Sequence, residues 1–362
     1  MKLDDLHSLL EYQVNNACSD LHLYSDNIPY LRTPSGDLEN IEGVEMLTHE
    51  NIENLASEIL SAKQLEVLKT QKDFELSSTF STHGRFRVTF FYDMQGMAIV
   101  FRAIPDNTYT LEQLGIPSQL NHVASLTHGL VLVTGPNGSG KSTTMASLVN
   151  EINETRKCNI ITIEDPIEYI HESKKSFISQ REVGSQVLAF KEAGKHIFRQ
   201  DVNVVVVGEL RDFESFTMAL DIAETGHLVI STMHAESTTS ALSRIIGIFP
   251  DEKQNLIRTK LSFALRAIIS QKLITRKDQA GRALACEYLV PDDVVRNMIA
   301  NNDISKIRSM IEHATLDSSL GFSRSILELY KKGVITKEQA IANIENHEDF
   351  SELRQVEYAG GM

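Results

Sequence analysis

The sequence predicts a parallel α/β domain that follows a smaller α+β domain and precedes a helical segment. With 362 residues, the chain exceeds the length that one hydrophobic core usually serves, so two or three domains are expected. Apolar and polar residues often alternate between residues 19 and 105, and four short apolar runs follow between residues 130 and 230. Alternation is typical of half-buried strands, whereas continuous apolar runs favour parallel strands covered on both faces.

The amino-terminal region combines strand and helix patterns. Residues 20–23 and 85–90 alternate as half-buried strands do, while residues 51–68 have helical spacing. Residues 105–108 have turn chemistry and little apolar surface to bury, which is typical of a linker. We therefore expect an α+β domain over residues 1–104 and a linker over residues 105–110.

The second domain is predicted from four apolar runs. They cover residues 130–133, 160–163, 204–207 and 228–230. The segments between them are long enough for crossover helices, so an α/β sheet of the RecA kind is expected over residues 111–275. From about residue 251 the spacing turns helical, and residues 322–332 predict a helix that ends at Gly333. Residues 276–362 are expected to form a helical subdomain.

Composition and charge exclude several classes of protein. Hydrophobic residues make up 42% and charged residues 23%, which is ordinary for a soluble globular chain. The net charge of -14 should repel nucleic acid, so we expect no nucleic-acid partner. Cys18, Cys158 and Cys286 lie far apart, which predicts neither a zinc site nor disulfides and fits a reducing cytoplasm. No signal peptide and no transmembrane segment is predicted, so any membrane association must come through a partner.

A phosphate-binding loop follows the first apolar run. The predicted nucleotide-binding residues run from the loop into the helix that begins near Thr143: Gly135, Pro136, Asn137, Gly138, Ser139, Gly140, Lys141, Ser142 and Thr143. Glycines let backbone N–H groups close around phosphates, Lys141 supplies a cation to the β and γ groups, and the Ser142 hydroxyl coordinates Mg²⁺. The alternative is a chance glycine-rich turn, which the flanking strand and helix disfavour.

Acidic residues end two of the other predicted strands. Glu209 follows residues 204–207 in the layout of a Walker B segment, where a carboxylate can hold Mg²⁺ or its water. Glu164 follows residues 160–163 and could polarise the attacking water. Alone, Glu209 would more often be only the end of a strand, and Glu164 a turn or capping acid before Pro166. The phosphate loop makes the functional interpretation of Glu209 the better one.

Two histidines flank the fourth apolar run. His227 precedes it and His234 follows it, so they should lie at opposite ends of a strand and not share a metal ion. His234 falls at the same edge as Lys141 and could contact the γ-phosphate. A lone histidine is usually structural, and His227 is expected to contact nearby residues of its own chain.

Six further segments carry a family pattern. They are residues 19–23 (SDLHL), 163–170 (IEDPIEYI), 180–183 (QREV), 208–212 (GELRD), 223–227 (AETGH) and 248–250 (IFP). Together they resemble the secretion-superfamily ATPases and, within that family, the type IV pilus retraction ATPases. The resemblance covers nearly the whole chain and implies a homohexamer with a PAS-like amino-terminal domain and a RecA-like ATPase domain. It also implies that Glu164 is the catalytic base and Glu209 the Walker B acid.

The resemblance further implies that arginines of the amino-terminal domain reach ATP across a subunit boundary. Arg85, Arg87 and Arg102 are the candidates, although Arg85 and Arg87 on an alternating strand would more often be solvated residues. Relatives usually have a further arginine before a glycine where this chain has residues 94–96 (MQG), so one contact is expected to be missing. Residues 202–203 (VN) replace the family's usual Pro-Asp, with no consequence for catalysis.

Residues 294–299 (VVRNMI) resemble the retraction motors' carboxyl-terminal helix motif, which serves movement and takes no part in hydrolysis. From the spacing alone an ordinary amphipathic helix is favoured. If the helix packs independently of the sheet, truncating Val295 and Met298 should leave ATP turnover nearly intact and abolish movement.

The resemblance implies a cytoplasmic motor, peripheral at the inner membrane through partners, that hydrolyses ATP with Mg²⁺ to power pilus retraction. The expected partners are an inner-membrane pilus platform protein and a paralogous motor. Three alternatives stay open: an ATPase of a related secretion or conjugation system, a non-hydrolysing accessory paralogue, which the change at Gln95 favours, and a helicase, which the acidic surface disfavours.

Overall fold

The chain divides into two units, which are described separately. The computed structural model describes residues 5–34, 36–80, 83–104, 108–279, 281–313 and 318–344. The first unit comprises residues 1–107 and 168–170, and the second the remaining residues from 108 onward. Residues 105–107 of the expected linker lie outside the described residues, and residues 108–110 have no regular structure.

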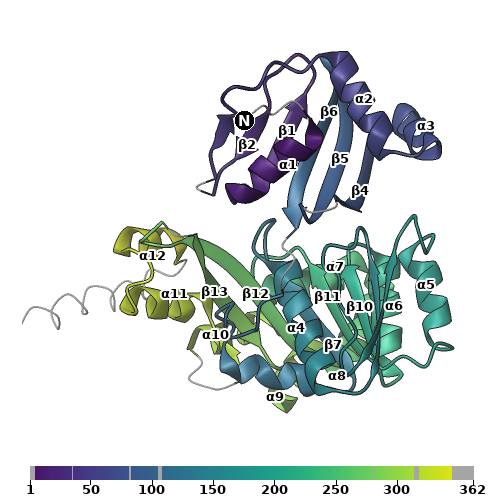
Figure 1. The fold of residues 1–362 in the computed structure, drawn as a ribbon. Helices are drawn as coiled ribbons and strands as arrows, with labels where there is room; N and C mark the ends of the chain where they lie inside the picture. Colours follow the sequence, from purple (N-terminus) through teal and green to yellow (C-terminus); the bar gives the residue numbers. More distant parts are fainter. Residues whose placement is uncertain are drawn as a thin grey trace, which may run out of the picture. The chain divides into compact units, whose positions relative to one another are not determined.

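The first unit is a six-stranded antiparallel sheet with helices (Figure 1). The strand order is β3-β2-β1-β6-β5-β4. Large apolar side chains, among them Leu21, Phe86 and Phe101, are fully buried with Leu10 and Ile52 of the helices. The elements are α1 (Leu6–Asn15), β1 (Asp20–Tyr24), β2 (Tyr30–Arg32), β3 (Leu38–Asn40), α2 (His49–Ile59), α3 (Ala62–Gln71), β4 (Asp73–Thr79), β5 (Arg85–Asp93) and β6 (Gly96–Ile104).

The helix expected over residues 51–68 is two helices, α2 and α3. Ser61 separates them with an extended backbone, and its hydroxyl accepts a hydrogen bond from the N–H of Gln64. The Gln64 side chain accepts in return from the Ser61 N–H, which completes a capping box. This pair of hydrogen bonds starts a new helix where apolar spacing alone predicts continuity.

The second unit contains an eight-stranded sheet in the order β14-β13-β12-β7-β11-β10-β8-β9 (Figure 1). The strands from β12 to β9 in this order are parallel, and β13 and β14 pair antiparallel. The strands are β7 (Gly129–Thr134), β8 (Asn159–Glu164), β9 (Phe177–Glu182), β10 (Val204–Glu209), β11 (Leu228–Met233), β12 (Leu265–Thr275), β13 (Arg282–Leu289) and β14 (Ser319–Leu320). The four predicted strands are β7, β8, β10 and β11.

Helices cover both faces of this sheet. On one face, Leu130 and Leu132 pack with α6 and α7, while on the other Val131 and Val133 pack with α4 and η1. This arrangement confirms the α/β class and explains the continuous apolar runs, because every residue of β7 is buried. The helices are η1 (Ser118–Ser125), α4 (Lys141–Thr155), α5 (Phe190–Ile197), α6 (Phe213–Glu224), α7 (Thr238–Ile248) and α8 (Asp251–Ala264).

The carboxyl-terminal part is less purely helical than expected, because β12 and β13 extend the central sheet. Its helices are α9 (Asp293–Ala300), α10 (Ile304–His313), α11 (Phe322–Lys331) and α12 (Lys337–Asn343). The predicted helix over residues 322–332 is α11, and Gly333 follows it with a positive φ of 70°. In the described part of the chain, no helix combines the length and apolar composition of a membrane-spanning segment.

Helix α9 does not pack independently of the sheet. Val295 is 3% exposed and belongs to the same core as Leu130 and Leu132 of β7. Met298 packs against this core as well. The condition for truncating both side chains without loss of ATP turnover, independent packing of α9, is therefore not met, because Val295 and Met298 hold α9 to the ATPase domain.

Candidate functional site

Four adjacent parallel strands bring the predicted site residues to one edge of the second unit. Strands β7, β11, β10 and β8 are neighbours and run in the same direction, so their carboxyl ends meet. The phosphate loop follows β7, His234 follows β11, and Glu209 and Glu164 end β10 and β8. The carboxyl edge of such a sheet is where α/β proteins bind ligands.

The phosphate loop has a backbone that requires glycine. Gly135 has a φ of +151°, and a Cβ atom there would lie 2.4 Å from the Ser139 Oγ and 2.5 Å from the Gln271 carbonyl oxygen. Gly140 is the N-cap of α4, with a φ of 87° and no side-chain cap. The first N–H groups of α4 therefore stay available to an anion, as in other phosphate loops.

Two polar side chains make this loop suited to phosphate. Among the described residues, the buried Ser139 Oγ is one of the atoms without a hydrogen-bond partner. The Lys141 Nζ donates to the carbonyl oxygens of Gly135 at 3.0 Å and Pro136 at 2.9 Å, so the ammonium lies over the loop. An inward hydroxyl and a cation at the start of a helix fit a bound phosphate chain.

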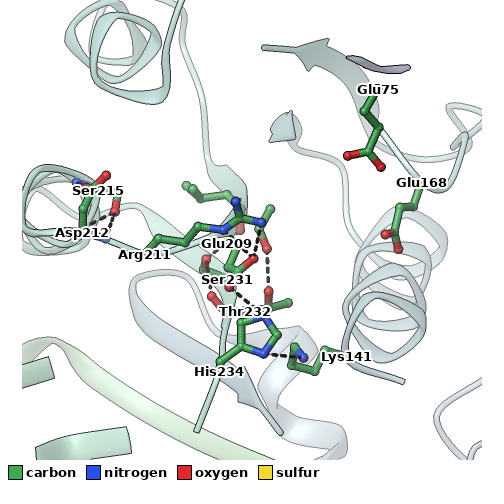
Figure 2. A network of polar contacts seen from close by, with 12 residues as sticks. Glu75, Lys141, Glu168, Glu209, Arg211, Asp212, Ser215, Ser231, Thr232 and His234 are labelled. Carbon is green, nitrogen blue, oxygen red and sulfur yellow. Dashed lines mark hydrogen bonds and ion pairs between the residues drawn. The ribbon is translucent and has the colours of Figure 1, made fainter. Parts of the chain in front are cut away.

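A line of contacts joins Lys141, His234 and Glu209 (Figure 2). The Lys141 Nζ lies 3.4 Å from the His234 Nδ1, and the His234 Nε2 lies 3.0 Å from the Glu209 Oε1. Burial, and next the charge of Lys141, lower the pKa of His234. An ammonium can only donate, so Nδ1 accepts and the proton of neutral His234 lies on Nε2, which donates to Glu209.

Glu209 is held by partners on both oxygens. Its Oε2 accepts from the Nε of Arg211 at 2.8 Å, while Oε1 faces His234. The strand register shifts between Val207 and Glu209, at Gly208. A Cβ atom on Gly208 would lie 3.3 Å from the Glu164 Cα, so the missing side chain lets the two acidic strand ends come close.

Glu164 is almost buried, with 7% of its surface exposed. Its Oε1 accepts from the Thr162 Oγ1 at 2.7 Å and from the Gln180 Nε2 at 3.4 Å. The first contact comes from the same strand and the second from β9, which lies beside β8. The carboxylate is thus fixed by two neighbours at the edge that carries the phosphate loop.

Comparison with known proteins agrees with this geometry. Residues 70–355 match the family described as "Type II/IV secretion system protein". The chain belongs to this family. The family assignment and the phosphate loop make it an ATP-hydrolysing P-loop enzyme, and the expected resemblance is confirmed.

Two twitching and pilus-retraction proteins and one solved structure match along most of their length. A "Twitching motility protein" of Neisseria gonorrhoeae is 39% identical over 316 residues, which cover 87% of this chain and 84% of that protein. The "Type IV pilus retractation ATPase PilT" of Pseudomonas aeruginosa is 37% identical over 350 residues, 96% of this chain and all of that protein. A crystal structure of the pilus retraction motor PilT with bound ADP superposes with a TM-score of 0.86 at 34% identity, covering 96% of this chain and 98% of that one.

The three candidate arginines of this family member lie in the first unit. The Arg102 Nε donates to the Asp20 Oδ1 at 2.7 Å. Arg87 pairs with Glu75 and with Glu168, and Arg85 lies two residues before it on β5. Their contact with nucleotide stays a prediction.

His227 lies at the other end of β11 from His234. Its Nδ1 is 3.0 Å from the Thr225 Oγ1 and 3.3 Å from the Ile222 carbonyl oxygen. The expectation that His227 contacts nearby residues of its own chain is confirmed. The two histidines are separated by the whole length of β11, as the sequence predicts.

Sequence reasoning missed residues that hydrogen-bond to the site residues and to the phosphate loop. Arg211 holds Glu209, and the Gln271 Nε2 donates to the Thr144 Oγ1 of α4 at 2.6 Å. The Arg282 Nη1 lies 3.3 Å from the Gly138 carbonyl oxygen of the loop. Arg211 could have been found from its place two residues after Glu209, whereas Gln271 and Arg282 come from strands that the sequence did not predict.

Proposed function

We propose that this chain is the subunit of a homohexameric motor that hydrolyses ATP to power type IV pilus retraction. The observation that carries the proposal is the full-length match to a pilus retraction ATPase, together with the line from Lys141 through His234 to Glu209. A rotation of the amino-terminal domain against the ATPase domain would couple nucleotide state to pilus withdrawal. The domain boundaries predicted above are part of this proposal.

The phosphate loop binds and orients the nucleotide. Residues 135–143 surround the phosphates with backbone N–H groups, and the Lys141 ammonium moves from the loop carbonyls to the β and γ oxygens. His234 contacts the γ-phosphate, which its place beside Lys141 supports. The nucleotide is therefore held by groups on one rigid sheet edge.

Glu164 acts as the base. Water adds to the γ-phosphorus, the bond from that phosphorus to the bridging oxygen of ADP breaks, and Glu164 takes a proton from the water. The hydrogen bond from Thr162 and the contact with Gln180 support this role, because they orient the carboxylate. Arg85, Arg87 and Arg102 of the adjacent subunit offset the charge that develops on the phosphate.

Mg²⁺ fits the donor set at the same edge. We assign it to the Ser142 hydroxyl and, directly or through water, to Glu209, which are oxygen ligands of the kind that this ion prefers. When bound, Mg²⁺ offsets negative charge on the β and γ oxygens. Glu209 would have to share its carboxylate with Arg211 and His234, whose contacts fix its direction.

The proposed cellular location follows from the proposed role in pilus retraction. A motor that withdraws pili acts in the cytoplasm and is peripheral at the inner membrane through partners. Its expected partners are an inner-membrane platform protein and a paralogous motor. The match to the "Type IV pilus ATPase PilU" of Pseudomonas aeruginosa supports the existence of such paralogues in this family.

Purified protein tests the enzymatic part of the proposal. Phosphate release and the mass of the particle should be measured for the wild type, Lys141→Ala and the control Lys157→Ala. Lys157 is an exposed lysine that follows α4. We expect a hexamer whose turnover is abolished by Lys141→Ala and unchanged by Lys157→Ala, because only Lys141 faces the phosphates. Normal hydrolysis by Lys141→Ala would remove the phosphate-loop assignment.

A further inference from the structure

Asp20 lies where three strands of the first unit meet. It begins β1, which runs between β2 and β6. The register places Asp20 opposite Arg32 of β2 and opposite Arg102 of β6. Directly opposed residues share a face of the sheet, so a single carboxylate faces one arginine on each side.

The Asp20 carboxylate is engaged through both oxygens. Oδ1 accepts from the Arg102 Nε at 2.7 Å, Oδ2 accepts from the Ser19 Oγ at 2.7 Å, and the Arg32 Nε lies 4.0 Å from Oδ2. The Asp20 side chain is only 5% exposed, whereas that of Arg102 is 62% exposed. The Asp20 carboxylate thus binds the Nε of Arg102, while the rest of the guanidinium is exposed to solvent.

The backbone around this ion pair is fixed as well. The Gln13 Nε2 donates to the carbonyl oxygens of Ser19 and Phe101, each at 3.1 Å. These carbonyls belong to the residues just before Asp20 and Arg102. The buried Gln13 amide on α1 therefore fixes the backbone just before both members of the ion pair.

We propose that Asp20 is a positioning residue, which holds the guanidinium of Arg102 ready for the phosphate of a nucleotide bound by the adjacent subunit. This inference rests on the proposed function. An arginine already held in one direction loses less conformational freedom when it binds phosphate, and small misplacements of a catalytic group cost rate steeply. It gives a function to Asp20, the acidic residue of the segment 19–23, which the proposed chemistry leaves unused.

Steady-state ATP hydrolysis by the full-length protein tests this role, with Asp20→Asn, Arg102→Ala and the double variant compared. Asp20→Asn keeps the size of the side chain and removes its charge. We expect it to lower kcat about 10-fold to 100-fold, the scale of a misplaced catalytic group, with little change in KM for ATP. The double variant should be no slower than Arg102→Ala, because Asp20 acts only through Arg102.

The control is Asp93→Ala, which removes a structural carboxylate from the same sheet. The Asp93 Oδ1 accepts from the N–H groups of Gln95 and Gly96 in the turn between β5 and β6. This variant should lower the melting temperature and leave kcat unchanged. Should Asp20→Asn fail to fold, Asp20→Thr takes its place, because threonine suits a strand. Its kcat is then compared with that of Arg102→Ala and of the double variant in the same way.

Three results would overturn the positioning role while ATP hydrolysis by this chain, the basis of the proposed function, stands. In the first, a folded Asp20 variant has a normal kcat although that of Arg102→Ala is lowered. In the second, the fold-losses in kcat of the two single variants multiply in the double variant. In the third, Arg102→Ala itself has a normal kcat. Absence of ATP hydrolysis by the wild type would instead contradict the proposed function. The two failures are therefore distinguishable in one set of assays.

Discussion

At the scale of single residues, the site depends on side chains whose direction is fixed by a neighbour. Lys141, Glu164, Glu209 and His234 could be placed at one edge from the sequence, because they follow or end strands expected to run parallel. Their supporting contacts could not be placed. The pairing of Arg102 with Asp20 depends on the register between β1 and β6, which alternation of apolar residues does not specify.

Glu164→Gln should bind ATP and turn over at least about 100-fold more slowly, because the amide cannot take a proton from water. Glutamine keeps the size of the side chain and an oxygen that can accept from Thr162. Nucleotide titration and phosphate release on the same preparation measure the two effects. Glu168→Gln is the matched control, and the roles have been assigned wrongly if that variant is inactive while Glu164→Gln is not.

His171 should make the protein less stable as the pH falls from about 6.5 to about 4. Burial, and next the charge of Lys174, lower the pKa of His171 from 6.5 to about 4. Between these values the unfolded chain binds a proton that the folded chain does not, so protonation favours unfolding. The full stability is present above pH 6.5, and the loss of stability reaches roughly 3 kcal/mol near pH 4.

Urea unfolding over this pH range measures the effect, with His171→Asn for comparison. Asparagine cannot be protonated, so the free energy of unfolding of the variant should depend less on pH. The difference in free energy of unfolding between the wild type and His171→Asn should shrink as the pH falls. Parallel pH profiles for both proteins would show that His171 does not bind a proton on unfolding.

At the scale of elements, the continuous apolar strands were predictable and the mixed ones were not. Strand β12 contains Ser270, Gln271 and Lys272 in succession and directly follows helix α8, so its spacing did not reveal a strand. Ser270 and Gln271 are nevertheless buried, and each is satisfied by a side-chain hydrogen bond, Ser270 with Thr134 and Gln271 with Thr144. Their partners lie more than a hundred residues away in sequence, beyond the reach of local patterns.

Helix α9 should be sensitive to truncation on its buried face and tolerant of it on its exposed face. Val295→Ala should cost about 2 kcal/mol and lower melting temperature and turnover together, because Val295 packs in the core of the sheet. Val294 is 55% exposed, so Val294→Ala should change stability by less than about 0.5 kcal/mol and leave turnover intact. Calorimetry and phosphate release measure both variants.

The exposed face of α9 also gives the cleaner test of force transmission. If α9 passes force to a partner, Val294→Ala should impair twitching in cells although its stability and turnover are normal. Val295→Ala cannot decide this, since a destabilised ATPase domain would also stop movement. Normal twitching by Val294→Ala together with Asn297→Ala, on the same exposed face, would leave α9 as a structural helix.

At the scale of the whole molecule, the α/β class and the family were accessible from motifs spread along the chain. The arrangement of subunits was not, because a hexamer and its shared sites depend on contacts between copies. The amino-terminal arginines illustrate this, because their role across a subunit boundary rests on family resemblance. Within the first unit the structure pairs Arg87 with Glu75 and Glu168, and Arg102 with Asp20.

The central claim is that ATP hydrolysis by this chain withdraws pili, and counting surface pili while recording twitching tests it most directly. Cells that lack the gene should be complemented with the wild type, Lys141→Ala or the control Lys157→Ala. We predict that Lys141→Ala cells keep their surface pili and do not twitch, whereas wild type and Lys157→Ala restore movement. Loss of surface pili in the Lys141→Ala cells would indicate an assembly motor, and normal twitching would indicate another process; either result would contradict the account.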